Sequence, residues 1–110
     1  MPKKRKRNKT EQENPGHILK NVPDHQVFNC QDGTKFKSLE ELSIALKTMR
    51  TGIFLYHVHP GTNDFANWIY NVIGDIDLAN NLRDMTDQKD FIKKIYSRIS
   101  SIKSTQKEKE

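Results

Sequence analysis

The sequence predicts a small two-layer α+β domain, in which a β-hairpin and one central strand are covered by about four helices in the order ββαβααα. Three observations lead to this class. A turn dipeptide separates two short apolar runs, a longer run rich in β-branched and aromatic residues follows, and four segments place apolar residues at helical spacing. The predicted domain spans residues 22–102.

An Asp32-Gly33 dipeptide predicts the hairpin, because both residue types accept the positive backbone angles of a type I′ turn. Cys30 is the single cysteine of the chain and falls in the first strand, where a small buried hydrophobic residue is the usual role. A nucleophilic pairing of Cys30 with His57 or His25 is the alternative.

The next two elements are a helix and the central strand. Ser38 and Glu41 have the spacing of a capping box, in which the serine oxygen accepts the Glu41 amide and the carboxylate returns to the Ser38 amide. Apolar residues at helical spacing then predict a helix over residues 39–49. Ile53–Val58 is apolar on both faces, which predicts a central, covered strand.

Three further helices complete the predicted domain. Asn63 is a favourable N-cap for the first of them, which Gly74 ends. Asp75 can cap the second helix, and Thr86 or Asp87 starts the third. The apolar residues that give these helices a buried face are Phe65, Trp68, Ile69 and Val72, then Ile76, Leu78, Ala79 and Leu82, and finally Phe91, Ile95, Ile99 and Ile102.

Positive charge is concentrated at the N-terminus. Residues 1–10 hold six of the 19 basic residues and none of the 14 acidic ones, so the other hundred residues carry 13 basic against 14 acidic side chains. Because like charges repel and cannot be buried together, we expect residues 1–14 to be a disordered basic arm. We also expect residues 103–110, which are nearly neutral, to be a second disordered tail. The basic residues of the arm are Lys3, Lys4, Arg5, Lys6, Arg7 and Lys9.

A basic segment of this kind is typical of proteins that bind polyanions, because each neutralised phosphate releases a condensed counterion. Such binding is non-specific in sequence. The alternatives are a purely solubilising tail and a nuclear import signal, which residues 2–7 resemble.

Composition narrows the class of protein. The mean hydropathy is −0.86, and no apolar run approaches the roughly 20 residues of a membrane span. A single cysteine excludes an internal disulfide, and the basic N-terminus does not lead into the apolar stretch of a signal peptide. We therefore expect a reducing, cytoplasmic setting and no membrane partner.

Several spaced motifs occur in order: Tyr56-His57-Val58, Asn63-Asp64-Phe65-Ala66-Asn67-Trp68-Ile69, Val72-Ile73-Gly74-Asp75 and Leu78-Ala79. Together they resemble an uncharacterised archaeal and bacterial domain family of unknown function, over about residues 26–83. The resemblance implies an intracellular prokaryotic protein, which disfavours the nuclear import signal. It carries over no catalytic residues.

The cluster whose side chains best suit metal binding or catalysis consists of His57, His59, Asn63 and Asp64. Two histidines at i and i+2 of a strand share a face and could hold a metal ion with Asp64, leaving an open position as in a catalytic zinc site. However, Asn63 and Asp64 are equally explained as helix cap and first-turn residues. We favour a structural or partner-binding cluster with Tyr70 beside it, and expect no bound metal or cofactor.

Two further patterns bear on contact with nucleic acid. Phe65 and Trp68 lie on the apolar helix face and are expected in the core, whereas Tyr70 is expected outside. A basic ridge along the last helix, interrupted by Asp87 and Asp90, is better explained as a solvated face with pairs such as Asp90 and Lys94. The residues of the ridge are Lys89, Lys93, Lys94, Arg98 and Lys103.

The leading hypothesis is a non-enzymatic binding module whose basic arm gives non-specific contact with nucleic acid or a nucleoprotein. The alternative is a protein-interaction or regulatory subunit whose arm only solubilises it. A third hypothesis is a small metal-assisted enzyme that uses His57, His59 and Asp64.

Overall fold

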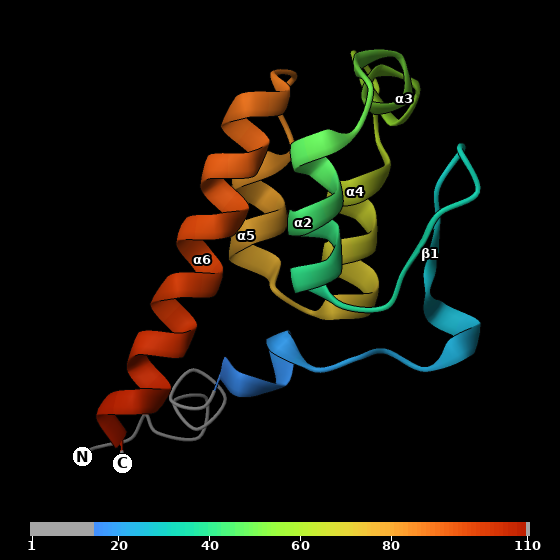
Figure 1. Cartoon of the computed structure of the whole chain (residues 1–110). Helices are drawn as coiled ribbons and strands as arrows, with labels where there is room; N and C mark the ends of the chain where they lie inside the picture. The colour runs from blue at the N-terminus through green and yellow to red at the C-terminus, as the bar shows by residue number, and fades with distance from the viewer. Residues whose placement is uncertain (1–14, 110) are drawn as a thin grey trace.

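The computed structural model describes residues 15–109 and has the expected small α+β architecture, with helices predominating (Figure 1). The short helical turns are η1 (Pro15–Leu19), η2 (Asp24–Gln26) and the π-helical η3 (Ile69–Ile73). The α-helices are α2 (Leu39–Thr48), α3 (Thr51–His57), α4 (Asp64–Trp68), α5 (Ile76–Leu82) and α6 (Gln88–Lys109). The strands are β1 (Phe28–Asn29), β2 (Lys35–Phe36), β3 (Val58–His59) and β4 (Thr62–Asn63).

The strands form two separate antiparallel pairs, β1 with β2 and β3 with β4, and not one sheet. Helix α6 packs against both α2 and α5, and α5 also contacts α4. Figure 1 shows these helices side by side, with the β1–β2 hairpin beside α4. Phe28 of β1 packs against Phe65 and Trp68 of α4, with ring centroids 5.0 and 5.8 Å apart. The predicted layer of helices is therefore present, whereas the sheet is reduced to two ribbons.

The predicted central strand is wrong, because most of Ile53–Val58 belongs to helix α3. Phe54 and His57 are buried at helical spacing, while Leu55 and Tyr56 are 46% and 58% exposed. A central strand needs hydrogen-bonding neighbours on both edges, and the described chain offers only two-residue ribbons. A helix satisfies its own backbone, so packing overrides the local β-propensity.

The β1–β2 hairpin is confirmed, but its turn lies one residue earlier than predicted. The amide of Gly33 donates to the Cys30 carbonyl at 2.9 Å, which places Gln31 and Asp32 at the centre of the turn. Gly33 follows with a φ of 94°, a conformation that glycine adopts without strain. The Asp32 carboxylate accepts from the backbone and hydroxyl of Thr34, at 2.9 and 2.7 Å, which fixes this form of the turn.

The predicted helix caps are present with one difference. The Ser38 hydroxyl oxygen accepts from the Glu41 amide at 3.1 Å, as expected. The Glu41 carboxylate, however, accepts from the Lys37 amide at 2.9 Å and not from that of Ser38. Gly74 ends η3 with a φ of 89°, and its amide donates to the Ile69 carbonyl.

The core lies between α6 and the remaining helices. Phe54, Phe65 and Phe91 form a cluster with ring centroids 5.1–6.2 Å apart. The whole predicted apolar stripe of the last helix is buried: Phe91, Ile95, Ile99 and Ile102. Burial of one such side chain stabilises the fold by roughly 1.5–3 kcal/mol.

The ordered part of the chain exceeds the predicted range of 22–102 at both ends. Ile18 in η1 is only 4% exposed, and η1 packs against α2 and α6. Helix α6 continues to Lys109, so residues 103–109 are helical where a disordered tail was expected. The predicted basic arm, residues 1–14, lies outside the described residues. No helix within residues 15–109 combines the length and apolar composition needed to cross a bilayer.

Candidate functional site

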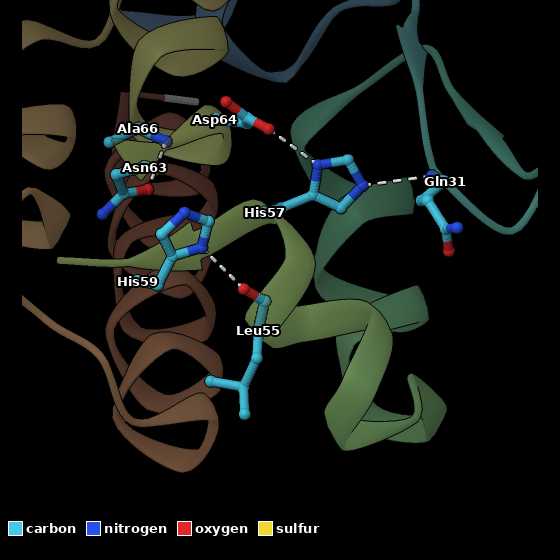
Figure 2. Close-up of polar contacts among 7 residues, drawn as sticks. All are labelled: Gln31, Leu55, His57, His59, Asn63, Asp64 and Ala66. Atoms are coloured by element: carbon cyan, nitrogen blue, oxygen red, sulfur yellow. Dashed lines mark hydrogen bonds and ion pairs between the residues drawn. The ribbon is translucent and has the colours of Figure 1, made fainter. Parts of the chain in front are cut away.

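His57 is a buried member of the predicted cluster, and both of its ring nitrogens have partners. It ends α3, is 4% exposed, and its Nδ1 lies 2.8 Å from Oδ2 of Asp64 (Figure 2). Its Nε2 accepts from the Gln31 amide at 3.0 Å. Because Nε2 is an acceptor, the ring proton of the neutral imidazole lies on Nδ1 and is donated to Asp64.

This geometry gives His57 a structural role. Both ring nitrogens are occupied, and together they join α3 to the β1–β2 turn and to the first turn of α4. Phe28 and Phe65 lie against the ring with centroids 5.2 Å away, and the Tyr56 ring approaches edge-on at 4.9 Å. The imidazole therefore has no free nitrogen with which to bind a metal ion or take a proton from a substrate.

His59 does not share the position predicted for it. It lies in β3 and is exposed, and its Nδ1 contacts the Leu55 carbonyl at 2.8 Å, so the two rings have different partners (Figure 2). The alternation of a strand does not apply, because His57 belongs to a helix. Among residues 15–109 no group of three or more histidine, cysteine or acidic side chains is placed to hold a metal ion. The joint metal site of His57, His59 and Asp64, which was the less favoured alternative, is therefore not supported by this geometry.

Asn63 is buried and connects two helices, so its side chain is not exposed to a binding partner. It is 7% exposed, and its Oδ1 accepts from the Ala66 amide at 3.0 Å, which confirms the predicted cap. Its Nδ2 donates to the carbonyls of Leu82 and Arg83 at 2.9 and 3.3 Å. One side chain thus starts α4 and binds the end of α5, a connection that no local sequence pattern indicates.

A surface groove of about 460 Å³ lies between the β3–β4 hairpin and the loop from α5 to α6. His59, Asn67 and Arg83 are among its lining residues. Arg83 donates to Oδ1 of Asn67 at 2.9 Å, and its guanidinium lies 5.7 Å from the ring centroid of Tyr70. Tyr70 is 42% exposed, as expected, and is linked to the groove through its contact with Arg83. Sequence reasoning missed Arg83, because its hydrogen-bond partner lies 16 residues earlier.

The other candidates are internal. Trp68 is 7% exposed and donates to the Gln26 carbonyl at 2.8 Å, and Phe65 is fully buried, so both belong to the core as predicted. Cys30 is also buried, and burial raises the pKa of its thiol. Its alternative pairing with His57 is not formed, because other groups occupy both His57 nitrogens.

The predicted basic ridge on α6 is divided between two sides of the helix. Arg98 donates to the buried carboxylate of Asp75 at 2.6 Å, on the side of α5. Lys103 pairs with Glu40 at 2.8 Å, on the side of α2. Within the described part of the chain the expected pair of Asp90 with Lys94 is not among the ion pairs. The arm residues Lys3, Lys4, Arg5, Lys6, Arg7 and Lys9 lie outside the described residues.

Comparisons with protein-family models, curated proteins and solved structures give no match for this chain.

Proposed function

We propose that the protein is a non-enzymatic nucleic-acid-binding module, in which the folded domain carries a basic N-terminal segment that contacts phosphate groups. The observation that carries this proposal is the segregation of charge. Six basic and no acidic residues lie in residues 1–10, while the rest of the chain holds 13 basic and 14 acidic side chains. A segment of this composition gains affinity for any polyphosphate by counterion release.

The geometry of the predicted cluster supports binding over catalysis. A histidine that acts as a general base needs one ring nitrogen within reach of the substrate. In His57 both nitrogens are bound within the domain, to Asp64 and to the amide of Gln31. The hydrogen-bonded pair of His57 and Asp64 stabilises the junction of α3, α4 and the β1–β2 turn, and the residues around this pair also stabilise the fold.

The experiment is fluorescence-anisotropy titration of a labelled single-stranded oligonucleotide at about 150 mM salt. Full-length protein should bind with a Kd in the range of about 1–100 μM, which is usual for non-specific contact. A full-length variant with glutamine at the six basic positions of residues 1–10 should bind at least about tenfold more weakly. Equal binding by both proteins, or no binding by either, contradicts the proposal.

A second candidate is docking of a protein partner at the groove beside the β3–β4 hairpin. The stacked pair of Arg83 and Tyr70 favours it, because arginine and tyrosine are enriched at interface hot spots. If the partner is a second copy of the chain, sedimentation should give a mass above 12.9 kDa that falls to the monomer in a Tyr70→Ala variant. A monomer at every concentration removes self-association.

A further inference from the structure

One exposed face of α6 carries a regular row of side chains. Lys89, Lys93, Tyr96, Ser100 and Lys103 follow one another at intervals of four, three, four and three residues, and all five are exposed. Residues at this spacing share one side of a helix. We call these five residues the α6 basic row. It extends over about 21 Å at 1.5 Å per residue.

The α6 basic row borders α2. The Nζ of Lys47 on α2 lies 5.7 Å from the ring centroid of Tyr96, near the middle of the row. Glu40, also on α2, pairs with Lys103 at 2.8 Å. Lys47, Lys89 and Lys93 form no ion pair with the described side chains, those of residues 15–105, so their charges stay available to an anion.

Acidic side chains gather on the other flank of α6. Asp75 at the start of α5 is buried against Arg98, and Asp77 lies in a surface groove together with Lys94 and Arg98. Asp90 on α6 is turned by about 100° from Lys89, away from α2. The helix therefore separates a positive flank beside α2 from a mixed flank beside α5.

Tyr96 gives the positive flank an aromatic surface. Its side chain is 58% exposed although it lies next to the buried Ile95 and close to Ile99. An exposed ring among ammonium groups matches the two parts of a nucleotide, since a base can stack on the ring while phosphates meet the lysines. A base inside a duplex has its faces covered, so this arrangement fits a single strand.

We propose that the α6 basic row, together with Lys47, binds single-stranded nucleic acid, with Tyr96 as the stacking platform and with Lys47, Lys89 and Lys93 on the phosphates. This inference rests on the proposed function and assigns the folded domain its own share of the contact. It predicts that the domain, and not the N-terminal segment alone, distinguishes single strands from duplexes.

The test uses the full chain and a labelled oligothymidylate of about 12 nucleotides, within the usual site size of such proteins. Tyr96→Leu should weaken binding about 5- to 100-fold, the loss expected for one stacked base, while Tyr96→Phe keeps the ring and binds like the wild type. Tyr56→Leu is the matched control, because Tyr56 is also 58% exposed but lies on α3. It should leave the affinity within about twofold.

The lysines are tested by salt dependence. Lys93→Gln should reduce the magnitude of the slope of log affinity against log salt by about 0.7 for a single strand. Lys35→Gln on the hairpin should leave this slope unchanged. Circular dichroism of each variant checks that the fold is intact. If Tyr96→Leu binds as tightly as the wild type while neutralisation of residues 1–10 abolishes binding, this inference is overturned and the proposed function stands. If the wild type itself binds no oligonucleotide, both are overturned.

Discussion

Removal of the Asn63 side chain should be among the most destabilising changes to the surroundings of the groove. In Asn63→Ala the amide of Ala66 loses its cap, which costs about 0.5–2 kcal/mol. The carbonyls of Leu82 and Arg83 lose the Nδ2 donor, and because the Leu82 carbonyl keeps the Met85 amide at 2.9 Å, this loss costs about 0.5–1.5 kcal/mol. Because Asn63 is buried, water replaces these bonds poorly, and the two terms together predict a loss of about 1–3.5 kcal/mol.

Urea unfolding followed by circular dichroism measures this loss as a lower midpoint at an unchanged m-value. Asn63→Ser separates the two terms, because the serine oxygen can still cap α4 while the donor to α5 is lost, so it should retain about 1 kcal/mol relative to the alanine variant. Asn67→Ala is the control, since its hydrogen bond to Arg83 is exposed, and it should cost less than about 0.5 kcal/mol. A loss below about 1 kcal/mol in Asn63→Ala would refute the proposed link between α4 and α5.

Three other substitutions test the buried polar contacts. Arg98→Met leaves the carboxylate of Asp75 buried without its cation, and thermal unfolding should show a loss of about 3 kcal/mol; an unchanged midpoint would show that the pair contributes nothing. His57→Phe removes the acceptor of the Gln31 amide and should cost about 1–3 kcal/mol by urea unfolding, and a neutral result would contradict the structural role of His57. Burial raises the pKa of the Cys30 thiol above its ordinary value of 9.0. The contribution of the buried neutral thiol to stability is therefore complete below pH 9.0. It is lost as the pH rises, because the thiol of the unfolded chain ionises first. Thermal midpoints between about pH 8 and 10.5 should therefore fall more steeply in the wild type than in Cys30→Ala, and parallel curves would contradict this assignment.

Local signals in the sequence predicted local structure well. The caps at Ser38, Asn63 and Asp75 each involve a side chain and an amide three residues later, so both partners lie within one short window. The buried stripe of α6 follows in the same way from helical spacing. These features need no knowledge of the rest of the fold.

Features that depend on distant partners could not be predicted. The run Ile53–Val58 favours a strand locally, yet most of it is helical because no neighbouring strand pairs with it. The amide that binds His57 lies 26 residues away in a turn. Arg98 and Lys103 of the predicted ridge lie on different sides of α6, because they pair with Asp75 and Glu40. These partners lie 23 and 63 residues away in the sequence.

The central claim is that the basic N-terminal segment binds phosphate groups, and the salt dependence of binding tests it most directly. Affinity for a labelled single strand is measured by anisotropy across a salt series, for the wild type and for the variant with glutamine at the six basic positions of residues 1–10. If all six side chains contact phosphates, the slope of log affinity against log salt should decrease in magnitude by up to about 4 in the variant. Equal slopes for the two proteins would contradict the claim.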